Sequence, residues 1–205
     1  SLMKCALQLP VRRFLLPDTL GVLNPFDTMD YMEEMTSRYP GVHFDFHAHN
    51  DYDLATANVI AAVKAGAKGI HCTVNGLGER AGNATLSSSV TALHDQLGAT
   101  TGIDESKINK VSHIVESFSG IPIPPNKPII GESVFTQCAG VHADGDNKNN
   151  LYYNDLLPER FGREREYALG KTSGRANIRK NLESLGIELS DEEILRVTDR
   201  VIQLG

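Results

Sequence analysis

The first hundred residues of this chain repeat one arrangement three times: a short apolar run, a turn and a helical pattern. The apolar runs cover 12–19, 42–49 and 69–74, and the helical patterns cover 24–41, 53–69 and 85–98. Neighbouring parallel strands cannot be joined by a hairpin and need a crossover of about a dozen residues or more, usually a helix. The three units therefore predict parallel strands with helical crossovers, which is an α/β fold.

Turn and capping residues set the boundaries of these helices. Asn24 is a suitable N-cap, Pro25 fits the first turn, and Gly41 follows the end of the first helix. Gly66 closes the second, Ala-rich helix directly before the third strand. Each strand is thus expected to begin soon after a helix has ended.

The second strand carries an unusual polar face. In "HFDFHAHND", polar and apolar residues alternate, which places four polar side chains on one face of the strand: His43, Asp45, His47 and His49. The other face carries Phe44, Phe46 and Ala48, which are ordinary core residues. Burying polar groups without partners costs a few kcal/mol each, about 2–7 by transfer data, so the polar face suggests a use.

Two interpretations of the histidine pair stay open on this evidence. His47 and His49 project in one direction, and neutral imidazole is a good ligand for a divalent transition metal. Equally, they could be surface or hydrogen-bonded core histidines. Their position favours the metal, because α/β enzymes place their sites at the carboxyl ends of parallel strands. There, three strand ends would bring together Asp18, Thr19, His47, His49, Asn50, Asp51, Asn75, Glu79, Arg80 and Asn83.

The second half of the chain has a different organisation. We expect a helix over 104–120 with Ile108, Val111, Val115 and Phe118 on one side, and an extended connector over the proline-rich 121–132. An irregular ordered loop should follow over 134–162. Two helices close the chain, and the last one starts with the capping box Ser190 and Glu193 and should bury Ile194, Val197 and Val201.

Composition excludes several kinds of partner. A formal net charge of -6 and a pI near 5.6 argue against nucleic acid and anionic membrane surfaces. No apolar run approaches the roughly 20 residues that span a bilayer, and the start "SLMKCALQLP" lacks a secretory apolar region. The three scattered cysteines form no disulfide or metal-binding pattern, so we expect a cytoplasmic protein.

Four motifs together resemble a known family. "HAHND", "NGLGERAGN", "GVHADGD" and "LGKTSGRANI" occur in the order found in the 2-isopropylmalate, citramalate and homocitrate synthases. The resemblance covers essentially the whole chain. It implies a metal-bearing (β/α)8 barrel that condenses acetyl-CoA with a 2-keto acid in amino-acid biosynthesis, such as leucine biosynthesis.

The resemblance also implies roles for individual residues. His47 and His49 would bind a divalent metal (Zn, Mn or Mg), with Asn83 on or near it, and Thr19 would lie beside the 2-keto acid. His142 and Tyr152 would be catalytic residues that reach the active site of the partner subunit in a homodimer. Asp53 stands where many members carry Gly, a variant associated with the citramalate-like branch, so the keto acid stays open.

The strand count departs from a complete barrel. A closed (β/α)8 barrel takes about 200–250 residues, whereas only three strand–helix units precede residue 100. By the resemblance, an Arg-Asp-Gly segment and a Glu base are among the missing parts. We therefore expect a partial TIM barrel: its last three strand–helix units over 1–100, then a mostly helical linker and dimerisation subdomain over 101–205.

This organisation leaves several functions to distinguish. The first is a 2-isopropylmalate synthase-like acyltransferase, of which this chain is an incomplete unit that is inactive alone. A citramalate or homocitrate synthase is an alternative within the same chemistry. The others are an inactive fragment that only binds metal and self-associates, and a metal-dependent carbon–carbon lyase on a similar barrel.

Overall fold

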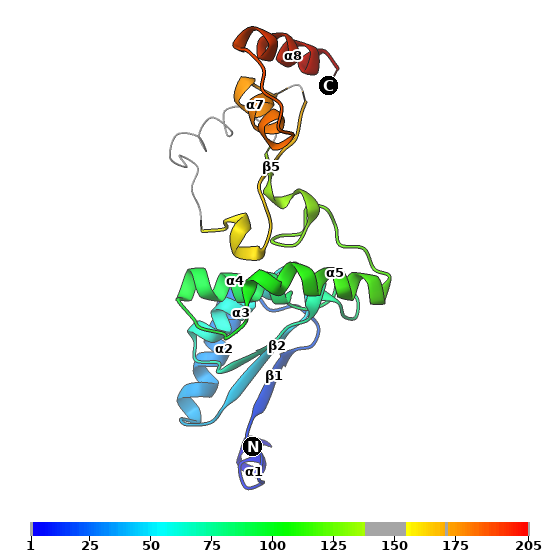
Figure 1. The fold of residues 1–205 in the computed structure, drawn as a ribbon. Helices are drawn as coiled ribbons and strands as arrows, with labels where there is room; N and C mark the ends of the chain where they lie inside the picture. The colour runs from blue at the N-terminus through cyan, green and yellow to red at the C-terminus, as the bar shows by residue number, and fades with distance from the viewer. Residues whose placement is uncertain (1, 138–154, 171, 205) are drawn as a thin grey trace. The chain divides into compact units, whose positions relative to one another are not determined.

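The computed structural model describes residues 2–137, 155–170 and 172–204. The chain divides into two compact units, Ser1–Ile123 and Pro124–Gly205, which are described separately (Figure 1). The division into a barrel part over 1–100 and a linker over 101–205 concerns function, and it stays a prediction.

The first unit contains the three parallel strands that the sequence predicts. Strands β1 (Phe14–Asp18), β2 (Phe44–Ala48) and β3 (Gly69–His71) form a sheet in the order β1-β2-β3. Both pairs are parallel, and His47 lies opposite Pro17 on one side and His71 on the other. Pro17 falls inside β1, where it is tolerated because β2 is the only strand that pairs with β1 in the described chain.

Helices cover the apolar face of this sheet. The short α1 (Leu2–Ala6) precedes β1, and the crossovers are α2 (Pro25–Arg38) and α3 (Ala55–Lys64), with α4 (Leu86–Leu97) after β3. Figure 1 shows α2 and α3 side by side on one face of the sheet. In α2, the Asn24 side chain accepts from the backbone N–H groups of Phe26 and Asp27, which confirms the predicted cap.

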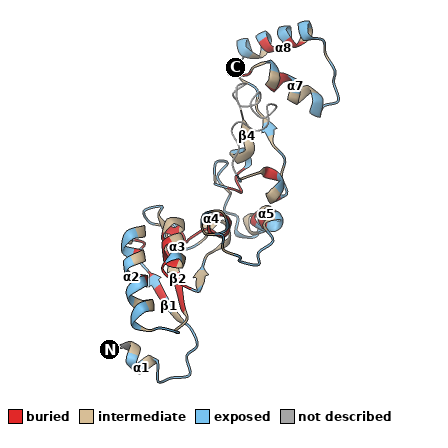
Figure 2. Ribbon diagram, turned by 90° about the vertical axis from the view of Figure 1, so that its left-hand side faces the viewer, coloured by how far each residue is buried: buried red, intermediate tan, exposed pale blue. Residues whose placement is uncertain are grey.

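The core forms between that face and these helices. Phe44, Phe46 and Ala48 of β2 are completely buried, together with Met32 of α2 and Val59 of α3. Figure 2 shows buried residues gathered on β1, β2 and α3. The alternation in β2 thus has the predicted consequence: one face makes the core, and the polar face points away from it.

Helix α5 (Ile108–Ser119) packs differently from its predicted pattern. It follows a 3-10 turn, η2 (Glu105–Lys107), and buries Ile108 and Ser112, whereas Phe118 is 87% exposed. The Asn75 side chain, in the short η1 (Val74–Gly76), donates to the carbonyl oxygen of Ser112. Of the residues predicted on one side of this helix, Ile108 is buried and Val115 is half-buried, whereas Val111 and Phe118 are exposed in the first unit.

The second unit begins with turns and a two-stranded ladder. Its elements are η3 (Glu132–Phe135), β4 (Thr136–Gln137), η4 (Pro158–Phe161) and β5 (Glu166–Tyr167), with β4 parallel to β5. The expected extended connector is wrong from residue 124 onward. Lys127 N–H donates to the Pro124 carbonyl, and Gly131 N–H donates to the Lys127 carbonyl, so this segment turns and buries Ile130.

Two helices complete this unit, α7 (Arg175–Ser184) and α8 (Asp191–Leu204). The capping box is confirmed, since the Glu193 carboxylate accepts from both the backbone N–H and the hydroxyl of Ser190. Ile194 is buried as predicted, and Val197 and Val201 are half-buried. No helix among the described residues is long and apolar enough to cross a membrane.

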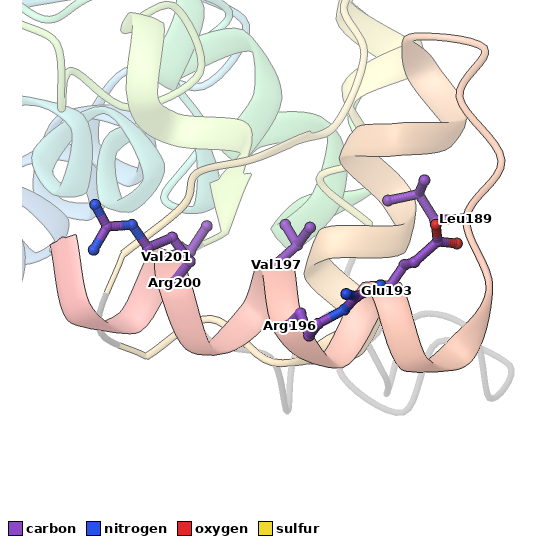
Figure 3. A pocket seen from close by; sticks show the side chains of 6 residues that line it. All are labelled: Leu189, Glu193, Arg196, Val197, Arg200 and Val201. Carbon is purple, nitrogen blue, oxygen red and sulfur yellow. The ribbon is translucent and has the colours of Figure 1, made fainter.

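An open pocket runs along α8 (Figure 3). Its lining consists of Leu189, Glu193, Arg196, Val197, Arg200 and Val201. None of these is a predicted site residue, so the pocket does not mark the site that the sequence predicts.

Candidate metal centre

The predicted metal ligands come together where β2 ends. His47 lies in β2 and His49 directly follows it. Their ring centroids are 5.0 Å apart, and the rings are nearly perpendicular, at 89°. The His71 ring, on the neighbouring strand, lies 6.0 Å from His47.

Asn83 reaches this pair because the loop after β3 folds back on the end of β2. His49 and Asn83 form an isolated antiparallel bridge. Two backbone bonds flank it, since Asn50 N–H donates to the Gly82 carbonyl and Ala84 N–H donates to the Ala48 carbonyl, each at 3.0 Å. Gly78 leaves room for Asn83 in this loop, because a Cβ at position 78 would collide with the Asn83 side-chain amide.

The three residues also have unused buried acceptors. Nδ1 of His47, Nδ1 of His49 and Oδ1 of Asn83 are buried without a hydrogen-bond partner. The Asn83 amide nitrogen donates to the Leu77 carbonyl at 3.0 Å, which leaves Oδ1 as its free acceptor. Buried polar atoms without partners cost about 1–3 kcal/mol each, and imidazole nitrogen and amide oxygen are suitable metal ligands. The donor set thus fits a divalent cation.

The protonation state of His47 suits this role. Burial, and then the neighbouring His49 and His71 rings, lower the pKa of His47 below its usual value. A lowered pKa keeps the imidazole neutral near pH 7, and the neutral ring is the form that binds metals.

Thr19, Asp51 and Arg80 lie around the same strand ends. Thr19 is exposed in the turn after β1, and its carbonyl accepts from the Arg80 guanidinium at 2.9 Å. Arg80 also donates to both carboxylate oxygens of Asp51, at 2.8 and 2.9 Å, which lowers the pKa of Asp51. Glu79 is only a distant partner of Arg80, at 3.9 Å.

The loop after His49 explains two further positions. The Asn50 side chain accepts from Ala55 N–H at 3.1 Å, which is a hydrogen bond at the start of α3. Asp53 has a φ of 59°, in the left-handed region, and its carboxylate accepts from the Asn50 amide. Glycine would adopt this conformation without strain, so the Asp53 side chain is held in a backbone region that favours glycine.

One polar cluster was missed by sequence reasoning. Asp45 is buried on the polar face, where Arg13 donates to both its oxygens at 2.8 and 2.9 Å and His43 Nε2 lies 3.0 Å away. Burial alone would raise the pKa of Asp45, but the Arg13 and His43 contacts outweigh it and lower the pKa. Gly69 on β3 is part of this cluster, because a Cβ there would collide with the Asp45 carboxylate.

The described residues supply an incomplete ligand set. Within 2–137, 155–170 and 172–204, no group of three or more His, Cys, Asp or Glu side chains could hold a metal ion. The candidate ligands in the described part of the chain are therefore two imidazoles and one amide. The predicted catalytic residues His142 and Tyr152 lie outside the described residues.

Family models match both parts of the chain. Residues 1–115 match the HMGL-like family, and residues 129–205 match the homocitrate synthase post-HMGL domain-like family. The first match covers the three strand–helix units and the candidate centre.

Curated relatives include three kinds of synthase. The chain is 42% identical over 200 residues to the 2-isopropylmalate synthase of Sulfurisphaera tokodaii, which covers 98% of this chain and 52% of that protein. It is 42% identical over 189 residues to the homocitrate synthase of Sulfolobus acidocaldarius, which covers 92% of this chain and 40% of that protein. It is 42% identical over 188 residues to the (R)-citramalate synthase of Methanocaldococcus jannaschii, which covers 92% of this chain and 38% of that protein. The chain thus spans about two-fifths to half the length of these relatives.

Solved structures show the same fold in part. The HMG-CoA lyase of Bacillus subtilis superposes with a TM-score of 0.55 at 25% identity, over 60% of this chain and 43% of the lyase. An HMG-CoA lyase from Acinetobacter baumannii, in complex with coenzyme A and 3-methylmalate, superposes with a TM-score of 0.54 at 26% identity. The match covers 60% of this chain and 42% of that lyase. The chain is a partial barrel of this type.

Proposed function

Because this chain belongs to the HMGL-like family, together with 2-isopropylmalate, citramalate and homocitrate synthases, we propose that it is part of an acyltransferase that condenses acetyl-CoA with a 2-keto acid. The observation that carries the proposal is the convergence of His47, His49 and Asn83, each with an unused buried acceptor, at the carboxyl end of parallel strands. The two motifs that supply these residues are separate in sequence and meet at this point.

His47, His49 and Asn83 would hold a divalent ion, with Zn, Mn and Mg as candidates. When bound, such an ion acts as a Lewis acid on the oxygens of the keto acid. The burial of His47 keeps its ring neutral for this purpose. Thr19, in the exposed turn after β1, would contact the keto acid, and the glycine loop over 75–83 holds the Asn83 amide in place.

The condensation needs more than these residues supply. A base must take a proton from the acetyl methyl group, and the new bond joins that carbon to the keto carbon. Three strands of an eight-stranded barrel provide one side of such a site. We therefore expect the 205-residue chain to be inactive by itself.

The remaining roles rest on sequence. We infer a homodimer in which His142 and Tyr152 serve the partner's site, with leucine biosynthesis in the cytoplasm as the setting. Support comes from the "GVHADGD" motif and from the match of 129–205 to a domain that follows the barrel in homocitrate synthases. An extended connector would also have favoured this arrangement, but the turns over 124–131 show that the connector is not a simple extended arm.

A lyase is the second candidate function. The superposed HMG-CoA lyases favour it through their fold. The higher identity to the synthases, and the post-HMGL domain over 129–205, favour the acyltransferase. A fragment that only binds metal and self-associates remains the alternative if neither activity is found.

A chimera tests the proposal. This chain would replace the matching 200 residues of the Sulfurisphaera tokodaii synthase. Release of CoA from acetyl-CoA would be measured with a series of 2-keto acids of increasing side-chain length. Release that requires a 2-keto acid and is lost in His47→Ala supports the synthase, and the preferred acid identifies the branch. A folded chimera that cleaves a 3-hydroxyacyl-CoA but condenses nothing would overturn the proposal in favour of the lyase.

A further inference from the structure

One side chain connects the ends of all three strands. The Arg80 guanidinium, in the loop after β3, donates to both carboxylate oxygens of Asp51, in the loop after β2. It also donates to the carbonyl oxygen of Thr19, in the turn after β1. A planar guanidinium suits this task, because its five N–H donors point in fixed directions and can serve a carboxylate and a carbonyl together.

The surrounding backbone is shaped around this contact. Arg80 itself has a φ of 55°, which is uncommon for a residue with a side chain and costs of order 1 kcal/mol or more. Gly21, with a φ of 63°, lies against Asp51, and a Cβ at Gly21 would collide with the Asp51 carboxylate and crowd its backbone nitrogen. Both sides of Asp51 are thus occupied, by Arg80 and by the β1 turn.

The same loops carry the candidate metal ligands. Asp51 lies two residues after His49, and Arg80 lies three residues before Asn83. The His49–Asn83 bridge joins the two loops through the backbone. Arg80 and Asp51 join the same two loops a second time, through their side chains.

Arg80 also controls what Asp51 can do. With both oxygens accepting from the guanidinium, the carboxylate makes no hydrogen bond to Nδ1 of His49, which has no partner. A free carboxylate two residues after His49 could compete as a ligand for the ion. The Arg80–Asp51 contact therefore has two effects: it fixes the two loops, and it keeps Asp51 from acting as a ligand.

We propose that Arg80 is a positioning residue, which holds His49 and Asn83 in the arrangement that binds the ion by clamping Asp51 and the Thr19 carbonyl. This inference rests on the proposed metal function. Arg80 acts through the loops and is given no contact with substrate.

The first test does not use a metal. Arg80→Lys keeps the positive charge but cannot span the same three acceptors. Amide hydrogen exchange should become at least tenfold faster at Asn50 and Asn83, whose N–H groups donate to Gly82 and Gly76. Exchange at Lys68, whose N–H donates to Phe44 at the other end of the sheet, should not change. Unchanged exchange at Asn50 and Asn83 would overturn the clamp.

The second test measures cobalt binding to the whole chain, by the visible absorption of bound Co²⁺. We expect Arg80→Lys to weaken binding about tenfold and to shift the spectrum, since outer partners of metal ligands contribute about 10–100-fold. In an Asp51→Asn background the same substitution should add little, because the clamp is already broken. Arg12→Lys, an exposed arginine before β1, is the matched control.

The two tests separate the inference from the proposed function. If His47→Ala abolishes cobalt binding while Arg80→Lys leaves affinity and spectrum unchanged, the positioning role is wrong and the metal site stands. If His47→Ala leaves cobalt binding unchanged, the metal assignment itself fails, and the positioning role fails with it.

Discussion

His49 and Asn83 face each other across an antiparallel bridge that belongs to no regular sheet. Each is one residue of a separate motif, and each has a buried acceptor atom without a partner. The bridge therefore brings these two motifs together at the end of β2.

The first prediction concerns metal uptake. A His47→Ala, His49→Ala double variant should lose divalent-ion binding in titration calorimetry, since it removes two of the three donors that converge here. His113→Ala, on exposed α5, is the matched control and should bind as the unaltered chain does. Equal uptake by the double variant would rule out the assignment.

The second prediction concerns Gly69. Gly69→Ala should destabilise the first unit by about 1–3 kcal/mol in urea unfolding, because the new methyl group collides with the Asp45 carboxylate. In an Asp45→Ala background, the same substitution should cost much less. Gly170→Ala, at a glycine with open space around it, is the control. An equal cost with and without the Asp45 side chain would show that the collision is not the cause.

The third prediction concerns acid stability. Ile123 N–H and then the His113 ring hydrogen-bond the Glu116 carboxylate and lower its pKa. Because the pKa of Glu116 is lower in the folded protein than in the unfolded chain, where it is about 4.3, the ionised carboxylate stabilises the fold at pH values above about 4.3. This stabilisation is lost as the pH falls through the pKa of the folded protein. Glu116→Gln should therefore lower stability near pH 7 and flatten the loss of stability below pH of about 4.3.

Thermal unfolding between acid and neutral pH would measure this difference. Glu33→Gln, which removes an exposed carboxylate of α2, serves as the control. If both variants show the same pH profile, the Glu116 contacts contribute nothing specific.

The fourth prediction concerns self-association. In the described chain, β1 and β3 each pair on one side only, and Leu15 is 44% exposed on the face away from the helices. Such edges and apolar side chains promote association, so light scattering should show oligomers at micromolar concentration. Leu15→Lys should reduce their size, whereas Leu20→Lys, in the following turn, should not. A chain that stays monomeric on concentration would contradict this.

The fifth prediction tests the inferred exchange between subunits in a complete barrel. His47→Ala and Tyr152→Phe chimeras, each inactive alone, would be unfolded and refolded together in equal amounts. Random pairing makes half the dimers mixed, and each mixed dimer has one intact site if the linker serves the partner. Activity should then return to about a quarter of the unaltered level by this two-fold arithmetic. If the refolded mixture is no more active than the two variants measured separately, then His47 and Tyr152 of one subunit serve the same site.

Periodicity predicted the parts of this fold that depend on local rules. The strand period of two fixes which face of β2 carries Phe44 and which carries His47, and crossover helices require parallel strands. The convergence of His47, His49 and Asn83 followed from the common level of parallel strand ends, and the family resemblance added only the proposed metal role of Asn83.

Features that depend on long-range register could not be predicted in this way. Arg13 reaches Asp45 only because β1 pairs with β2 in a particular register, which alternation does not fix. The hydrogen bond from Asn75 to the Ser112 carbonyl likewise joins two segments that are far apart in sequence. Hydrogen-bonded turns over 124–131 accompany the burial of Ile130, and the number of prolines in a segment does not show which of its residues will be buried.

The contact between Gly69 and Asp45 has an evolutionary consequence. While position 45 carries a carboxylate, any mutation that adds a side chain at position 69 meets the collision described above and should be removed by selection. A lineage that first replaces Asp45 with a small residue gains the freedom to vary at 69, and it also leaves Arg13 without its carboxylate partner. The three positions, each close to a different strand of the sheet, should therefore change together across the descendants of this gene.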